Sequence, residues 1–307
     1  MTHELMEHIK YPDLPKPPDE VHAFYIEFDL DDNGKLVQQK TKFYDELFND
    51  LIPFAFGDRN KAIRNVDFTK FSEMRREAAR RLYKIPDSKD LVNNYESAHD
   101  IPNSYLKRGE FGELVLYHIL HTYFNAESLI SKIYFKDNDN LPAHGFDAVH
   151  VDSKNKTLWL GESKLYEQSN QAIDALIQDL NEHFNTDFFH SEFQIITNRA
   201  INDSNVPVDP FIQRLLNPKT RILDKLANIN VALFAAYDSS SLTSEQQDDR
   251  EKKLEKEIKK LYRKIRKGIN EHAWNKQLKI FLLLFPLHDK KEFVKELHVK
   301  LLYAQQS

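Results

Sequence analysis

The sequence predicts a mixed α/β fold, because segments with helical periodicity alternate with short apolar segments along most of its 307 residues. The apolar runs Val231–Tyr237 and Ile280–Phe285 have the length of buried strands and fall far short of the roughly 18 residues of a membrane-spanning helix. A hydrophobic share of 41% with 30% charged residues is typical of a soluble globular protein. At roughly 150 residues per domain, the length allows two domains or one large α/β domain with an appended part.

The composition excludes several kinds of chemistry. The chain has no cysteine, which excludes disulfides, thiolate metal sites and cysteine nucleophiles. Its 43 Lys and Arg against 48 Asp and Glu give a net charge of −5, which argues against a protein that coats nucleic acid but leaves room for a local basic surface. No phosphate-binding loop motif occurs, so ATP use would need a partner. Because residues 1–20 lack a secretory signal, we expect a cytoplasmic protein without membrane contact.

We expect residues 1–100 to form an N-terminal α/β region that docks a partner or regulates the rest. Four prolines within residues 1–20 predict a flexible arm, with order beginning near Val21. Residues 21–38 predict a hairpin whose turn contains Gly34. The spacing of apolar residues predicts helices over 40–51 and 68–83, and the polar stretch 86–103 would serve as a boundary.

From residue 104 the periodicity is clearer. It predicts, in chain order, a helix over 104–124, strands over 129–135, 145–151 and 157–164, a helix over 169–184 and a strand over 193–198. Further expected elements are a helix over 209–226, a strand over 231–237, a charged helix within 244–267, a strand over 278–285 and a helix from residue 290. The charged helix has two interpretations, a solvated face held by Glu–Lys pairs or an edge that contacts phosphates.

The residues that can carry chemistry cluster at the end of the strand 157–164. Leu158, Leu160, Glu162 and Lys164 share one face of this strand, since strand side chains alternate. The strand begins apolar on both faces, which predicts a central position in the sheet. Its last residues nevertheless include a carboxylate and an ammonium group, whose burial without partners would cost several kcal/mol.

The preceding strand is expected to bring a second carboxylate to the same place. A hairpin symmetric about Lys154 and Asn155 opposes Asp147 to Glu162, with the two β-carbons about 5 Å apart. Two carboxylates with only Lys164 beside them repel each other, and a divalent cation relieves this repulsion. Mg²⁺ takes one or two carboxylates together with waters and phosphate oxygens, so the pattern indicates a metal site. A loop of odd length would break this pairing.

The helix over 104–124 offers a third acid. Glu113 lies on its apolar stripe and should point toward the sheet, and Glu110, one turn earlier, is the alternative. Gly109 and Gly112 each cost about 1 kcal/mol relative to Ala within a helix, so they predict that the backbone approaches a neighbour closely here.

These residues match a known pattern. Asp147, then Glu162-Ser163-Lys164 after fourteen intervening residues, preceded by a helical Glu, resembles the PD-(D/E)xK nuclease superfamily over about residues 104–198. His144-Gly145-Phe146 stands where that superfamily often has a proline. The blocks RGEFGELVLYHIL, HGFDAVHV and LWLGESKLY are similar to the HamA family, the nuclease-like component of the two-protein Hachiman anti-phage defence system.

The resemblance implies a fold and a metal site. The fold is a restriction-endonuclease-like core, an α-β-β-β-α-β mixed sheet flanked by helices, inside a nuclease domain over 101–307 whose C-terminal α/β extension covers 199–307. The implied ligands of Mg²⁺, or of Mn²⁺ in its place, are Glu113, Asp147, Glu162 and the backbone carbonyl of Ser163. A structural alternative for the same residues is a buried salt bridge between Glu162 and Lys164 with Asp147 capping a turn.

The function implied by the resemblance is metal-dependent hydrolysis of DNA phosphodiester bonds, controlled by a HamB-like helicase partner. Lys164 would orient or activate the attacking water and stabilise charge on the scissile phosphate. Gln171 either contacts the substrate backbone or is an ordinary solvent-facing residue. Two alternatives remain open: a catalytically silent scaffold that docks on a helicase or DNA, and a sequence-specific restriction or repair endonuclease with the same site.

Overall fold

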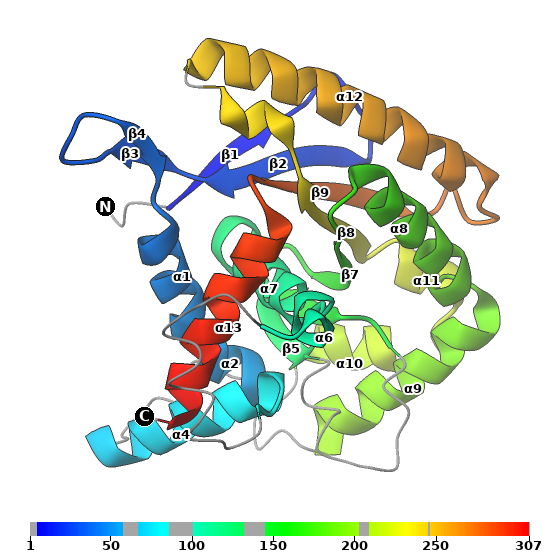
Figure 1. Ribbon diagram of the computed structural model, residues 1–307. Helices are drawn as coiled ribbons and strands as arrows, with labels where there is room; N and C mark the ends of the chain where they lie inside the picture. The colour runs from blue at the N-terminus through cyan, green and yellow to red at the C-terminus, as the bar shows by residue number, and fades with distance from the viewer. Residues whose placement is uncertain are drawn as a thin grey trace.

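A computed structural model describes residues 5–57, 67–85, 101–131, 145–202, 209–244 and 246–306. It contains a seven-stranded mixed sheet with helices on both faces (Figure 1), in the order β1-β2-β9-β8-β7-β6-β5. These strands are β1 (Met6–Lys10), β2 (Glu20–Ile26), β5 (Glu127–Ser131), β6 (Ala148–Asp152), β7 (Thr157–Leu165), β8 (Ile229–Asp238) and β9 (Lys279–Leu287). The four central strands β2, β9, β8 and β7 run parallel, while β1, β6 and β5 are antiparallel to their neighbours.

Two helical layers cover the sheet. One apolar core contains side chains of α1 (Lys40–Asn49), α2 (Leu51–Phe56), α4 (Phe68–Leu82), α7 (Glu110–Phe124) and α13 (Lys290–Gln306), with the short α6 (Asn103–Leu106) packed against it. The other contains side chains of α8 (Ser169–His183), α9 (Thr186–Asn202), α10 (Pro210–Leu216), α11 (Ile222–Leu226) and α12 (Gln247–Glu271). No helix in the described ranges is both long and apolar enough to cross a membrane.

The N-terminal residues differ from expectation. The flexible arm predicted over residues 1–20 is wrong from Met6 onward, because β1 pairs antiparallel with β2 and forms an edge of the sheet. The prolines lie in the connection between these two strands instead of in an arm. The predicted hairpin is confirmed over residues 28–38, as β3 (Phe28–Leu30) and β4 (Leu36–Gln38) with Gly34 at φ +74° in the turn, whereas residues 21–26 belong to β2 of the large sheet.

The strand predicted over 193–198 is also wrong, because this segment lies inside α9. Phe189, Phe193 and Ile196 are buried on one side of that helix, at the three- and four-residue spacing of helical neighbours. The next strand after α8 is β8, so the expected α-β-β-β-α-β order is not completed within residues 104–198. The helix predicted over 104–124 is divided into α6 and α7, and the one over 209–226 into α10 and α11.

Candidate functional site

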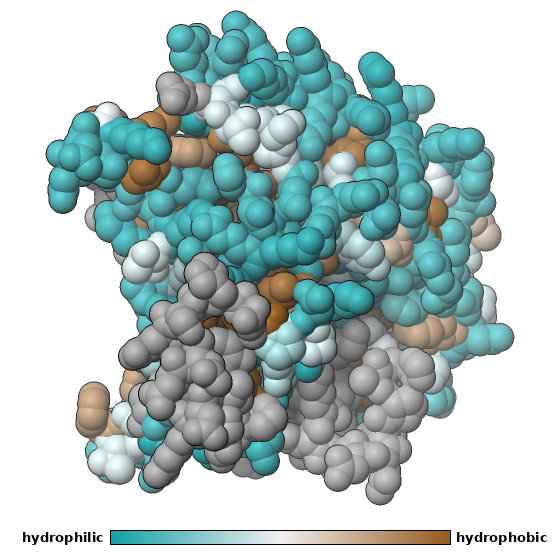
Figure 2. All heavy atoms as spheres, viewed as in Figure 1, coloured by the Kyte–Doolittle hydropathy of each residue, from teal (hydrophilic) through white to brown (hydrophobic). Residues whose placement is uncertain are grey.

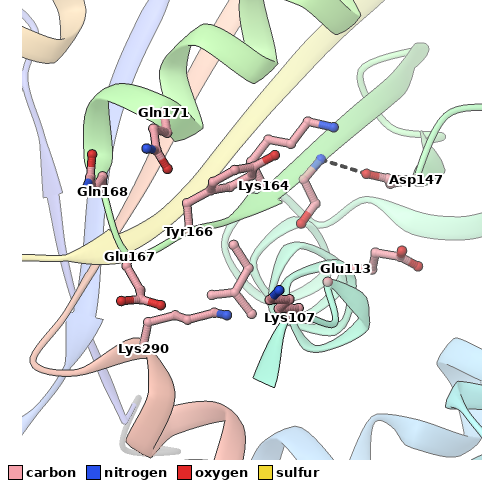
Figure 3. A pocket seen from close by; sticks show the side chains of 12 residues that line it. Lys107, Glu113, Asp147, Lys164, Tyr166, Glu167, Gln168, Gln171 and Lys290 are labelled. Atoms are coloured by element: carbon pink, nitrogen blue, oxygen red, sulfur yellow. Dashed lines mark hydrogen bonds between the residues drawn. The ribbon is translucent and has the colours of Figure 1, made fainter. Parts of the chain in front are cut away.

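A cavity of about 630 Å³ opens at the C-terminal end of β7 (Figure 3). Its lining is mostly polar and charged, and it includes five of the residues singled out from the sequence. These are Glu113, Asp147, Ser163, Lys164 and Gln171. Figure 3 shows Glu113 on α7, Asp147 just before β6, Lys164 on β7 and Gln171 in the first turn of α8. Ser163 precedes Lys164 on β7.

The register of the β6–β7 hairpin determines how the acids meet. Ala148 pairs with Gly161 across a four-residue loop, so the predicted register is confirmed and the next positions are Asp147 and Glu162. The ladder with β6 ends at Gly161, whereas the ladder with β8 continues to Leu165. The Ser163 amide therefore donates to Asp147 Oδ2, at 2.8 Å, instead of to a carbonyl of β6.

Glu162 and Lys164 both find partners on α8. The Glu162 side chain is almost fully buried, and its Oε1 lies 2.5 Å from His183 Nδ1. Lys164 forms an ion pair with Asp179, which lies one helical turn before His183. These contacts offset the cost of burying Glu162 and Lys164, because each of the two charged groups has a hydrogen-bonding partner on the neighbouring helix.

The surroundings of these groups shift their pKa values. Burial alone would lower the pKa of Lys164, but the hydrogen bond and charge of Asp179, with the charges of Asp147 and Glu162, raise it above its ordinary value. The amine is therefore cationic at neutral pH. Burial lowers the pKa of His183, although the charges of Asp179 and Asp147 oppose this shift. His183 Nδ1 and Glu162 Oε1 share one hydrogen bond, which the imidazole donates when the carboxyl group is ionised.

The acids of α7 approach from the other face of the sheet. Glu113 lines the cavity, whereas Glu110 does not and instead lies 2.5 Å from Arg108 Nη2. The predicted close approach is confirmed for Gly112, where a Cβ atom would lie 2.7 Å from Ser163 Oγ. It is wrong for Gly109, which has no such neighbour within 4 Å and caps the start of α7.

The donor set suits a hard cation in its chemistry, since carboxylate and carbonyl oxygens are the ligands that Mg²⁺ takes. In the part of the chain that the structure describes, no three His, Asp or Glu side chains converge closely enough to hold a metal ion as they stand. The contact with His183 explains part of this arrangement. Glu162 Oε1 is held by that imidazole, so binding an ion through this oxygen would require the carboxylate to turn away from His183.

Sequence reasoning missed four residues of this region. Asp179 and His183 could have been found from the sequence. Residues four apart on a helix lie on one face at about the same separation as residues two apart on a strand, so this pair on α8 can lie opposite Glu162 and Lys164 on β7. Lys107, just before α7, and Lys290, at the start of the distant α13, also line the cavity, and neither belongs to a motif in the sequence. Lys290 is buried, which lowers its pKa, and its ammonium group donates to the Leu106 carbonyl.

Two comparisons with known proteins bear on this arrangement. Among protein-family models, one described as HamA matches residues 2–301, nearly the whole chain. A search of curated proteins finds no match. The matched range includes every residue that lines the cavity.

Proposed function

The chain belongs to the HamA family, a component of the Hachiman defence system, and on this premise we propose that it is a Mg²⁺-dependent nuclease that hydrolyses DNA phosphodiester bonds. The observation that carries the proposal is the register of β6 and β7. It sets Asp147 across from Glu162, with Lys164 two residues further along the strand, at an open cavity. Acids and a lysine at such a strand end suit phosphoryl transfer, which depends on positioning and on neutralising negative charge.

The proposed ligands of the metal are Asp147, Glu162 and Glu113, with the carbonyl of Ser163. When bound, Mg²⁺ or Mn²⁺ lowers the pKa of a coordinated water and neutralises charge on the phosphate. Asp147 has an additional task, because its bond to the Ser163 amide keeps the strand end and the hairpin in register.

Lys164 acts on the substrate in this proposal. Its ammonium group remains charged at neutral pH, and it faces the same side of β7 as Glu162. A fixed cation there stabilises the negative charge that develops on the scissile phosphate and orients the attacking water. Asp179 is a positioning residue, since it holds the ammonium group without lining the cavity.

Gln171 extends the cavity along the first turn of α8. Its neutral amide can donate a hydrogen bond to a phosphate oxygen without competing with a metal for the carboxylates. We assign it to contact with the DNA backbone. A HamB-like helicase partner, implied by the Hachiman context, would control access to the site.

The test is a cleavage assay with matched variants. Purified protein, alone and together with its helicase partner, is incubated with linear and circular DNA in the presence of Mg²⁺ or of EDTA. We expect Glu162→Gln and Lys164→Met each to lower the cleavage rate about 10²–10³-fold, the loss typical of removing one electrostatic stabiliser. Glu182→Gln is the control, because Glu182 is an exposed carboxylate on the same helix as Asp179.

Two results would contradict the proposal. If Glu162→Gln and Lys164→Met cut as fast as wild type, the catalytic assignment is wrong. If wild type binds DNA and its partner but cuts neither substrate, the protein is the silent scaffold. Cleavage confined to one DNA sequence would instead favour a restriction or repair endonuclease. Circular dichroism spectra that match wild type establish that the variants are folded.

A further inference from the structure

Helix α12 carries a row of basic side chains on its outer face. Lys252, Lys256, Lys260, Arg263 and Lys267 are all exposed, and their spacing of three or four residues places them on one side of the helix. We name these five residues the α12 basic stripe. The opposite side of α12 is apolar and is buried in the hydrophobic core that α12 shares with α8, α9, α10 and α11.

Three cations on the flanks of α12 have acidic partners, which the stripe residues do not have in the part of the chain that the structure describes. Lys259 pairs with Glu255, Lys264 with Asp174 and Arg266 with Asp19. Within the described ranges, none of the five stripe residues forms an ion pair. The expectation of a face held by Glu–Lys pairs therefore applies to the flanks of α12, and it fails along the stripe.

This arrangement is unusual for a chain with a net charge of −5. On α13 the exposed charges alternate in sign, and Lys300 and Glu292 pair with residues of α1. Like charges four residues apart, as in Lys252, Lys256 and Lys260, repel each other and destabilise a helix. A bound polyanion would remove this repulsion.

We propose that the α12 basic stripe binds the phosphate backbone of duplex DNA outside the cavity. Four of its five members are lysines, a residue depleted from protein–protein interfaces. The large exposed hydrophobic residues that the structure describes all lie outside α12, so an apolar partner surface has nothing to cover there. Phosphates, in contrast, are bound through charge alone and without sequence preference.

The dimensions of the stripe suit a duplex. From Lys252 to Lys267 the helix rises about 22 Å, at 1.5 Å per residue. A DNA duplex carries about thirteen phosphates over that length, and those on the side that faces α12 lie opposite the stripe. Figure 2 shows a continuous hydrophilic surface along the top of the molecule, where Figure 1 places α12.

The stripe also lies next to the elements of the cavity. Lys264, on the flank of α12, contacts the start of α8 through Asp174 at 2.6 Å and the Asn170 carbonyl at 2.8 Å. Gln171, in the same turn, lines the cavity. One turn of α8 thus connects the two regions, and DNA held on the stripe is retained beside the site. The inference rests on the proposed function for the choice of DNA as the nucleic acid.

The test compares two triple variants with the same change in charge. The stripe variant carries Lys256→Gln, Lys260→Gln and Arg263→Gln, and glutamine keeps a helix propensity close to that of Lys and Arg. The control variant carries Lys35→Gln, Lys42→Gln and Lys154→Gln, three exposed cations scattered over other elements. Binding of a fluorescently labelled duplex is measured by anisotropy in EDTA, across a series of salt concentrations.

We expect the stripe variant to lower the slope of log K against log salt concentration by about 3, one for each lost phosphate contact. Referred to 1 M salt, this corresponds to about a 500-fold weaker affinity at 0.1 M salt, at 0.9 per phosphate contact, while the control variant stays close to wild type. Equal losses in both triples would show an effect of net charge alone and overturn the proposal. A stripe variant that binds like wild type would also overturn the proposal, and the stripe would then serve an acidic protein. A wild type that does not bind duplex at low salt would overturn it as well.

The outcome is separable from that of the proposed nuclease function. Because the binding assay contains no divalent metal, a wild type that never cuts DNA still reports on the stripe. In a cleavage assay we expect the stripe variant to raise KM and leave kcat unchanged, since these residues lie outside the cavity. A loss of kcat alone would contradict a docking role.

Discussion

Gly161 is the residue at which the geometry of the hairpin is most open to test. A Cβ atom at this position would lie 3.0 Å from Ala148 Cβ and 2.9 Å from Leu116 Cδ2. Ala148 is its partner across the β6–β7 ladder, so that Cβ moves only if the backbone moves. Leu116 is fully buried on α7 and has little room to withdraw. Gly161→Ala should therefore push both β6 and α7 away from β7.

The size of the effect follows from two opposing terms. Overpacking a core typically costs about 1–3 kcal/mol. Replacing glycine restricts the unfolded chain, which returns about 0.4–1 kcal/mol. We expect Gly161→Ala to lower the free energy of unfolding by about 1–2 kcal/mol, measured by urea denaturation with an unchanged m value. The cleavage rate should fall by more than the loss of stability alone explains, because Asp147 and Glu162 occupy the next positions of the same hairpin.

Gly109→Ala is the matched control. Nothing lies within 4 Å of its added Cβ, and its φ of −99° suits any residue, so we expect a change within about ±0.5 kcal/mol. Leu116→Ala supplies a second check, since the space it opens should reduce the cost of Gly161→Ala by at least about 0.5 kcal/mol. If Gly161→Ala is as stable as Gly109→Ala, the close packing of α7 on the hairpin is wrong.

Three further predictions concern protons, positioning and metal. Burial lowers the pKa of His150 from 6.5 to about 4. The unfolded chain therefore takes up this proton first as the pH falls, and stability should drop between about pH 6.5 and 4 by at most about 1.4 kcal/mol per unit. Urea titrations should show a shallower dependence in His150→Gln, and an unchanged one would refute this origin. Asp179→Asn should slow cleavage about tenfold or more through misplacement of Lys164, whereas Asp174→Asn, on the same helix, should not; equal rates would contradict the positioning role. Mg²⁺ at a hundred times its Kd should stabilise the protein by about 2.7 kcal/mol in thermal unfolding, and a similar gain in Glu162→Gln would exclude Glu162 as a ligand.

The elements around the cavity were predictable because their signals are local. The four-residue loop between β6 and β7 determines the register, and the alternation along β7 then determines which side chains share a face. The helical stripe of α8 likewise follows from spacing alone. In these segments, propensity, periodicity and burial all favour the same structure.

Two wrong assignments of secondary structure, the flexible arm over residues 1–20 and the strand over 193–198, occurred where local signals conflict. Residues 193–198 contain neighbouring isoleucines, which favour a strand, but Phe189, Phe193 and Ile196 complete a helical stripe that packs against the core. For β1 (Met6–Lys10), the four prolines that follow predict an irregular arm, and this signal outweighed the weak strand signal of the short segment before them. The pairing partner of that segment, β2, lies beyond the prolines, so only tertiary contact reveals it.

The partners of the charged residues were unpredictable for a different reason, and this reason explains where the cavity lies. Alternation sends Glu162 and Lys164 toward α8, while Ser163 and Leu165 face α7, so side chains from the two helices cannot meet through the body of the sheet. They can meet only where the sheet ends. Since β6 begins at Ala148, the last residues of β7 extend past it, and Asp147 and Glu113 reach the edge of this opening. A site that combines an acid of α7 with the charges facing α8 therefore depends on the hairpin ending where it does. A β6 strand longer by two residues at its start would close the opening.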